Sequence, residues 1–124
     1  MQSIILVDDE DHFRERLARA FINRGFTVYQ AANVDEALEK IKEFCPNWAL
    51  VDLKMPGLAG TDVVDVIQKR RPKTRVLLIT GHGSRHDELE KLANRGYRIL
   101  LKPFRIDRLI AMIREAAPSE KADG

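Results

Sequence analysis

Short apolar runs alternate along the chain with longer stretches in which apolar residues recur at helical spacing. The runs predict strands at Ser3–Val7, Thr27–Gln30, Trp48–Val51, Arg75–Ile79 and Arg98–Leu101. Three of these runs contain the continuously apolar segments IILV, ALV and VLLI, which is typical of strands buried on both faces of a parallel sheet. The second run, TVYQ, is short and mixed, so it suits the edge of a sheet.

The stretches between and after these runs predict helices over 11–24, 35–44, 61–70, 85–94 and 106–116. In the first stretch the apolar residues form one stripe, and the arginines opposite it are expected to be solvated, among them Arg14, Arg16 and Arg19. Gly25 and Gly96 stand where helix C-caps belong, because glycine enters the left-handed region without a steric penalty.

Five successive strand–helix units indicate a doubly wound, flavodoxin-like α/β fold. We expect a five-stranded parallel sheet in the order 2-1-3-4-5, flanked by five helices, because right-handed crossovers place helices on both faces. One domain is predicted over residues 1–117, and the segment 118–124 (PSEKADG) is expected to be a disordered tail or the start of a linker.

Composition narrows the setting in which this domain works. The 124 residues are 44% hydrophobic, which is enough for one globular core. Cys45 is the single cysteine, so no intrachain disulfide can form, and a reducing, cytoplasmic location is expected. No apolar run approaches the roughly 20 residues of a membrane span. The net charge of +2 gives no argument for direct contact with nucleic acid.

Polar residues stand at the carboxyl ends of four predicted strands. Asp8 and Asp9 follow the first strand, Asp52 the third, Thr80 the fourth and Lys102 the fifth. In an open α/β sheet this edge is where ligands bind, near the point where the strand order reverses. We therefore expect these five side chains to form one site.

The residue types at this edge form a coherent chemical set. Three carboxylates at close range raise one another's pKa unless a cation lies among them. An all-oxygen set without histidine or cysteine favours Mg²⁺ over zinc. Lys102 can pair with Asp52 and then with phosphoryl oxygens, and Thr80 can donate its hydroxyl to the same oxygens. Asp52 would be the nucleophile that forms an aspartyl-phosphate.

The segments VDDE, VDLKMPGLAG, ITGHG and LKPF resemble, in order and in spacing, the motifs of the response regulator receiver domain. The resemblance covers essentially the whole chain. It implies Asp52 as the phospho-acceptor, Thr80 as the switch hydroxyl and Lys102 as the phosphate-binding lysine, with a cis Lys102–Pro103 peptide. It implies a Mg²⁺ site formed by Asp8, Asp9, Asp52 and the backbone carbonyl of Lys54, beside a loop shaped by Met55, Pro56, Gly57 and Gly60.

The same resemblance implies a signalling role and its partners. A histidine kinase or phosphotransfer protein would phosphorylate Asp52, and the face formed by the fourth helix, fifth strand and fifth helix would change its affinity for an effector protein or output domain. A homodimer is a further expected partner state. The only reaction expected of the domain is its own phosphorylation and dephosphorylation. The chain is either a stand-alone receiver or part of a larger regulator.

One position departs from the family pattern. Ile99 stands three residues before Lys102, where the family has a rotating phenylalanine or tyrosine. Tyr97 points to the same side of an extended strand and is the candidate substitute, although it starts further from the site. A pseudo-receiver that docks without phosphorylation therefore remains the alternative reading.

Two other classes of function fit the sequence less well. A small phosphohydrolase would need a second acid two positions after Asp52, where Lys54 stands, and a cap over its substrate. A flavodoxin-like cofactor binder would need a glycine- or hydroxyl-rich loop after the first strand. That loop is DDED here, which repels phosphate in the absence of metal.

Overall fold

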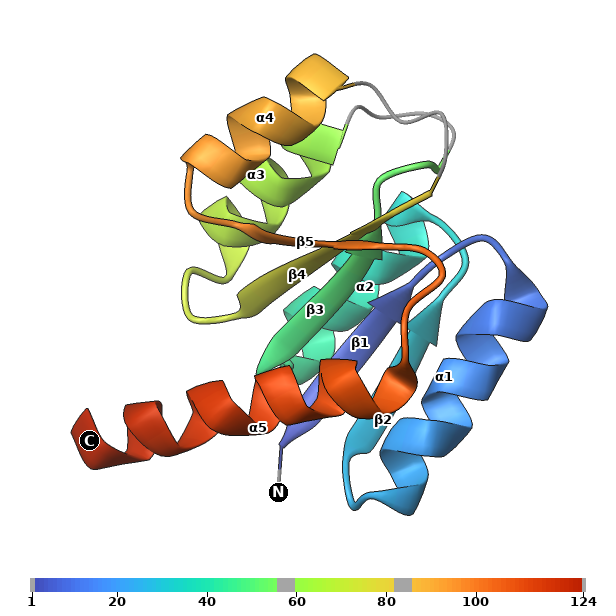
Figure 1. The fold of residues 1–124 in the computed structure, drawn as a ribbon, viewed down its shortest axis with the longest axis vertical. Coiled ribbons are helices and arrows are strands. Elements are labelled where there is room, and N and C mark those ends of the chain that lie inside the picture. Colours follow the sequence, from blue (N-terminus) through green and yellow to red (C-terminus); the bar gives the residue numbers. More distant parts are fainter. Residues whose placement is uncertain (1, 56–59, 82–85, 124) are drawn as a thin grey trace.

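The strands lie side by side in one parallel sheet at the centre of the molecule (Figure 1). The computed structural model describes residues 2–55, 60–81 and 86–123. The strands are β1 (Ser3–Val7), β2 (Thr27–Ala31), β3 (Trp48–Asp52), β4 (Arg75–Thr80) and β5 (Arg98–Leu101). Their order is β2-β1-β3-β4-β5, and each neighbouring pair is parallel. The predicted doubly wound α/β fold is confirmed.

Helices connect the strands and follow the last one. They are α1 (Asp11–Asn23), α2 (Val34–Phe44), α3 (Gly60–Arg70), α4 (His86–Asn94) and α5 (Ile106–Asp123). The first four differ from the predicted ranges by one residue at an end. Helix α5 continues to Asp123, well beyond the predicted end at 116, through backbone that was expected to be disordered. The division of the chain at residue 117 stays a prediction.

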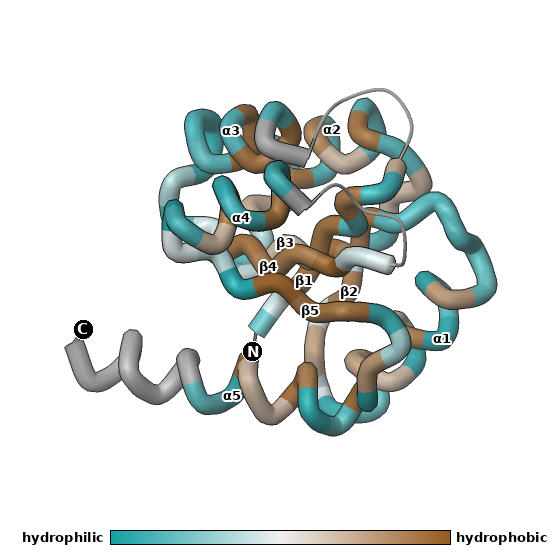
Figure 2. Tube along the Cα trace, turned by 45° about the horizontal axis from the view of Figure 1, so that its top comes forward, coloured by the Kyte–Doolittle hydropathy of each residue, from teal (hydrophilic) through white to brown (hydrophobic). Residues whose placement is uncertain are grey.

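Two hydrophobic clusters cover the two faces of the sheet. Buried residues of α2, α3 and α4 pack on one face, and those of α1 and α5 pack on the other. Figure 2 shows that hydrophobic positions dominate the central strands, whereas hydrophilic positions recur along the helices. Both faces of β1, β3 and β4 are therefore buried, which explains their continuous apolar sequences.

The strand register brings the carboxyl ends of four strands to one edge of the sheet. Val7 pairs with Val51, and Asp52 pairs with Ile79. Thr80 pairs with Leu101, the residue before Lys102. The first polar residues after each strand therefore meet at this edge, as expected for parallel strands.

At the opposite edge of the sheet, two helices end at glycines that turn the chain into the next strand. Gly25 and Gly96 adopt φ angles of 88° and 94°, and their N–H groups donate to the carbonyls of Ile22 and Ala93. The left-handed conformation predicted at both glycines is confirmed. It turns the chain sharply from α1 into β2 and from α4 into β5.

Candidate functional site

Asp8 directly follows the apolar strand β1 at the carboxyl edge of the sheet and is only 3% exposed. Its backbone N–H donates to the Ala31 carbonyl of β2 at 3.1 Å. Its side-chain Oδ1 accepts the Glu10 N–H at 2.9 Å. These two bonds fix both the main chain and the carboxylate of Asp8, so the side chain is held at the edge of the sheet.

Asp52 is the last residue of β3 and is 4% exposed. Its Oδ1 accepts the backbone N–H of Lys54 at 2.8 Å, because the chain turns back over the carboxylate as it leaves the strand. The N–H of Leu53 donates to Ile79 of β4 at 2.8 Å and continues the strand pairing past Asp52. The carboxylate is thereby fixed through Oδ1, and Oδ2 faces Lys102.

The ammonium group of Lys102 lies among three carboxylates. Its Nζ is 3.3 Å from Oδ2 of Asp8, 3.3 Å from Oδ2 of Asp52 and 3.1 Å from Oε1 of Glu10. The Phe13 ring lies against the same ammonium, with its centroid 4.2 Å from Nζ. A cation between carboxylates and an aromatic face is stabilised by both, and more strongly where water is partly excluded.

Thr80 ends β4 and is 1% exposed. Its carbonyl accepts the Lys102 N–H at 2.7 Å, so the backbones of these two residues are joined directly. Its Oγ1 lies 3.4 Å from the Gly81 carbonyl, at the long end of hydrogen-bond distance. The hydroxyl is therefore positioned at the same edge as Lys102 and Asp52.

The electrostatics of the cluster reflect its crowding. Burial raises the pKa of the Asp8 carboxyl from 3.8 to about 6, and the Asp52 charge adds to this rise against the opposing effects of the Glu10 N–H and Lys102. Burial lowers the pKa of Lys102, but its hydrogen bond to Glu10 and the charges of Asp52 and Asp8 outweigh that effect and raise it overall. Lys102 therefore stays protonated. Its partner Asp8 is buried, so keeping the Asp8 carboxylate ionised costs free energy.

The carboxylates that come together include one that the sequence did not single out. One oxygen from each of Asp8, Glu10 and Asp52 lies within 4.8 Å of the others. Asp9, which was expected in the metal site, is exposed and lies outside this group. The signal for Glu10 was present in the DDED run, but sequence alone does not show which acids of a turn face inward. The metal role of Asp9 stays a prediction.

Arg14 differs from the expectation that the α1 arginines are solvated. Its residue is 9% exposed, and its Nη1 donates to the Asp8 carbonyl at 2.6 Å. Arg16 and Arg19 are exposed, as predicted. The prediction failed at Arg14 because this residue stands at helical spacing with the buried Leu17, Ala18 and Phe21, so it lies on the core-facing side of α1 and not opposite it.

The other residues implied by the family motifs are placed as follows. The Lys102–Pro103 peptide is cis, as expected. The Lys54 side chain is exposed, and its backbone lies two residues after Asp52, the end of β3. Met55 is 8% exposed and belongs to the core, whereas Pro56 and Gly57 lie outside the described residues. The carbonyl role assigned to Lys54 stays a prediction.

Ile99 and Tyr97 lie on the same face of the sheet, where both pack against the cluster formed by α2, α3 and α4. The Arg95 guanidinium lies 5.7 Å from the centroid of the Tyr97 ring. Arg95 in turn forms an ion pair with Asp65 of α3. Tyr97 is thus covered from the α3 side before β5 begins, while Ile99 occupies the strand nearer to Lys102.

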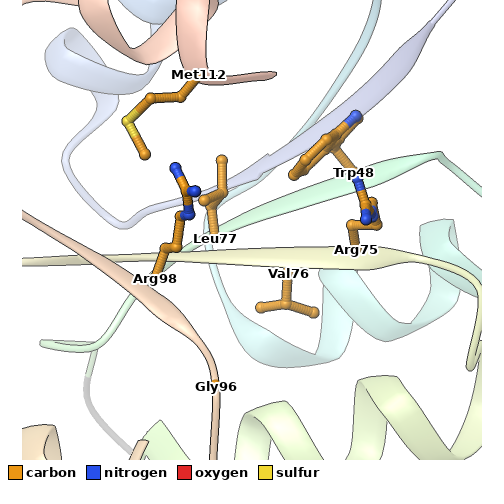
Figure 3. A pocket seen from close by; sticks show the side chains of 7 residues that line it. All are labelled: Trp48, Arg75, Val76, Leu77, Gly96, Arg98 and Met112. Atoms are coloured by element: carbon orange, nitrogen blue, oxygen red, sulfur yellow. The ribbon is translucent and has the colours of Figure 1, made fainter. Parts of the chain in front are cut away.

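A hollow at the other edge of the sheet does not belong to this site. Its volume is about 230 Å³, and it opens where β3, β4 and β5 begin, between Trp48, Arg75, Arg98 and Met112 (Figure 3). Trp48 and Asp52 are four positions apart along the extended strand β3, a distance of about 13 Å. The Arg75 guanidinium lies 5.4 Å from the centroid of the Trp48 ring, so these two lining residues already interact with each other.

A parallel sheet in this order, with buried acids and a lysine at its carboxyl edge, defines the chain as a receiver-type signalling module. The sequence matches the response regulator receiver domain family over residues 4–114, and the chain belongs to that family. It is 34% identical over 122 residues to the acid tolerance regulatory protein ActR of Rhizobium meliloti (strain 1021), a match that covers 98% of this chain and 62% of ActR.

Solved structures agree with this assignment. A CheY-like receiver domain protein from Methanospirillum hungatei JF-1 superposes with a TM-score of 0.90 at 26% identity, covering 100% of this chain and 99% of the other. A response regulator from Burkholderia pseudomallei, solved with a phosphorylated aspartic acid, a calcium ion and citrate, gives 0.81 at 25% identity, covering 99% and 72%.

The matches cover only part of the length of the curated relatives. The chain spans 62% of ActR and 45% of the photosynthetic apparatus regulatory protein RegA of Cereibacter sphaeroides, to which it is 40% identical over 83 residues. The similarity therefore concerns the receiver part of these regulators.

Within the part of the chain that the structure describes, none of the helices combines the length and the apolar character that crossing a membrane requires.

Proposed function

We propose that this chain is a phosphorylation-dependent signalling switch, in which Asp52 accepts a phosphoryl group from a histidine kinase or phosphotransfer protein in the cytoplasm. The observation that carries the proposal is the convergence of Asp8, Glu10 and Asp52 around the Lys102 ammonium at 3.1–3.3 Å. A buried cluster with more carboxylates than cations favours the entry of a further cation, and a phosphoryl group needs such positive charge.

The donor set fits Mg²⁺. We assign the metal to Asp8, Asp9, Asp52 and the Lys54 carbonyl, and the position of Glu10 adds it as a further oxygen donor to the site. All these ligands are hard oxygen donors, and the exposed residues Asp9 and Glu10 leave room for the water molecules that Mg²⁺ retains. When bound, Mg²⁺ would neutralise negative charge on the phosphoryl oxygens.

The two oxygens of Asp52 have different roles in this proposal. The Lys54 N–H occupies Oδ1, so Oδ2 is the oxygen that attacks phosphorus. A phosphorus–oxygen bond forms at Oδ2 as the bond between phosphorus and the histidine nitrogen of the donor breaks. Lys102, 3.3 Å from Oδ2, then pairs with the phosphoryl oxygens, and Thr80 donates its hydroxyl to them.

The readout follows from the added charge. Phosphorylation replaces the single negative charge of the Asp52 carboxylate with a phosphoryl group of close to two negative charges, a net gain of about one, at the edge where Thr80 ends β4. Because the Thr80 carbonyl accepts the Lys102 N–H, a shift of either residue is transmitted between β4 and β5. The face formed by α4, β5 and α5 then changes its affinity for an effector, an output domain or a second copy of the chain. The family has a rotating phenylalanine or tyrosine where Ile99 stands. Its coupling to the switch hydroxyl must therefore differ in this chain, and Tyr97 is the candidate substitute.

A similar protein supports the chemistry. The Burkholderia pseudomallei response regulator holds a phosphorylated aspartic acid and a calcium ion in its structure. Calcium, like Mg²⁺, is a hard divalent cation that takes oxygen ligands. By similarity, the acceptor in this chain is the buried aspartate at the end of β3.

The proposal is tested by incubating the protein with Mg²⁺ and acetyl phosphate and measuring the intact mass. The wild type is expected to gain one phosphoryl group, and Asp52→Ala none. Asp62→Ala is the matched control, because Asp62 is an exposed aspartate of α3, and it should be phosphorylated like the wild type. No adduct on the wild type would refute the proposal and favour the pseudo-receiver, and an unchanged adduct on Asp52→Ala would refute Asp52 as the acceptor.

A further inference from the structure

Arg14 is a buried charged residue with no part in the proposed phosphoryl transfer. Five polar residues are buried among those described: Asp8, Arg14, Asp52, Thr74 and Thr80. An arginine is rarely removed from water unless its donors are paired, because desolvating the charge is costly. The partners of its guanidinium therefore show what this burial achieves.

The guanidinium of Arg14 holds three groups at once. Its Nη1 donates to the Asp8 carbonyl at 2.6 Å, its Nε donates to Oε1 of Gln30 at 3.0 Å, and its Nη2 pairs with Oδ1 of Asp11 at 2.9 Å. These partners come from the loop after β1, from β2 and from the first turn of α1. A planar fork with donors in fixed directions can satisfy three such acceptors, whereas the single ammonium of a lysine cannot hold the same geometry.

The backbone of Gln30, whose side chain accepts from Arg14, is itself anchored. The carbonyl of Gln30 accepts Nζ of Lys40 from α2 at 2.5 Å, and the next residue, Ala31, accepts the N–H of Asp8. Arg14 therefore fastens the peptide between Asp8 and Asp9 to the edge strand β2, which pairs with β1 and is also held by Lys40 of α2. The orientation of this peptide sets the directions in which the first acids of the site project.

We infer that Arg14 is a positioning residue for the metal-binding acids of the loop that follows β1. The inference rests on the proposed function, since it assumes that these acids bind Mg²⁺. Without the guanidinium, the Asp8 carbonyl loses its partner, and the peptide that leads into Asp9 and Glu10 is held less firmly. Mg²⁺ must then gather them again, so its affinity falls.

Calorimetric titration of the metal-free protein with MgCl₂ tests this inference. Arg14→Met is expected to bind Mg²⁺ about 10-fold more weakly than the wild type, the scale on which groups that orient metal ligands act. Arg14→Lys keeps the charge but loses the fork, and should also bind more weakly. Gln30→Met removes one anchor and should show a smaller change in the same direction. Arg19→Met, an exposed arginine of the same helix, is the control and should bind like the wild type.

A second readout separates positioning from chemistry. In phosphorylation by acetyl phosphate, the Mg²⁺ concentration that gives half the maximal rate should rise by the same factor in Arg14→Met, while the rate at saturating Mg²⁺ stays at the wild-type value. Urea denaturation identifies a variant that fails to fold, in which case Arg14→Lys and Gln30→Met carry the test.

Several outcomes would overturn the inference. These are unchanged Mg²⁺ affinity in the folded Arg14 variants, a fall only in the saturated rate, and absence of Mg²⁺ binding by the wild type. Mg²⁺ binding by the wild type without phosphorylation would instead refute the proposed function, and the binding titrations would still decide the role of Arg14.

Discussion

The two edges of the sheet hold their polar residues in different ways. At the carboxyl edge three carboxylates surround one ammonium, and burial raises the pKa of Asp8 to about 6. At the amino edge, beside Arg75 and Arg98, several neutral groups pair with one another. The Ser3 N–H donates to Oδ1 of Asn47 at 2.8 Å, and the Asn47 N–H donates back to Oγ of Ser3 at 3.0 Å.

Further neutral pairs complete the amino edge. Thr74, which is 4% exposed, donates its hydroxyl to the Pro46 carbonyl at 2.8 Å. The indole N–H of Trp48 donates to Oε1 of Gln2 at 3.1 Å. These groups satisfy one another without any ligand, so this edge is explained by folding alone.

The difference shows how a functional edge is distinguished from a structural one. Polarity at the end of a strand is common to both. The carboxyl edge differs because three carboxylates share one ammonium, which favours a further cation. The following predictions test that contrast, from the largest expected effect to the smallest.

Lys102→Met should produce the largest change in stability. Three carboxylates would then lack their cation, and the metal-free variant should lose about 3 kcal/mol of unfolding free energy, as when one partner of a buried ion pair is removed. Urea denaturation measures this loss. Mg²⁺ should bind the variant more tightly than the wild type, because no ammonium competes for the acids, although phosphorylation should slow. Weaker Mg²⁺ binding in the variant would contradict this account of the edge.

The raised pKa of Asp8 predicts a pH-dependent cost. Because its pKa is higher in the folded protein than in the unfolded chain, ionising Asp8 destabilises the fold progressively from about pH 4 to about pH 6. Asp8→Asn removes this cost, so relative to the metal-free wild type it should gain on the order of 2 kcal/mol between these pH values. Urea denaturation across this range measures the difference, and a difference independent of pH would contradict the prediction.

Thr74→Val is the corresponding change at the amino edge. The buried Pro46 carbonyl would lose its hydrogen bond, at a cost of about 1 kcal/mol in unfolding free energy. Thr74→Ser keeps the hydroxyl and serves as the control. Because this edge is structural, the Mg²⁺ affinity and the phosphorylation rate of Thr74→Val should equal those of the wild type. A changed Mg²⁺ affinity would show that the two edges are not independent.

Cys45→Gly should have the smallest effect. Cys45 ends α2 with a φ of 47°, in the left-handed region that favours glycine. The substitution relieves this strain but adds freedom to the unfolded chain, so a net gain of about 0.5 kcal/mol is expected. Thermal denaturation under reducing conditions measures it, with Cys45→Ala, which keeps the strain, as the comparison. Phosphorylation should not change.

The sequence predicted the sheet because its strands are buried on both faces and therefore have continuous apolar runs. The same reasoning placed Asp8, Asp52, Thr80 and Lys102 at one edge, since the ends of parallel strands must meet there, and the structure confirms that placement. The role of each residue in phosphorylation stays a prediction. Strand periodicity stops where the strand stops, so it gave no means of choosing between Asp9 and Glu10 in the loop.

The expectation for Arg14 failed for another reason. Its position matches the buried stripe of Leu17, Ala18 and Phe21, but its charge indicated a solvated side chain. The sequence does not show that the Asp8 carbonyl and Gln30 pair with the guanidinium on that side. The extent of α5 was also missed, because its continuation carries no apolar stripe of the kind used to predict helices.

The most direct test of the account is to locate the phosphoryl group. The protein is phosphorylated with acetyl phosphate, the acyl phosphate is reduced with borohydride, and the modified residue is identified by peptide mapping. The account predicts reduction to homoserine at Asp52, only when Mg²⁺ is present during phosphorylation. Modification at Asp8 or Asp9, or modification of Asp52 that does not depend on Mg²⁺, would contradict it.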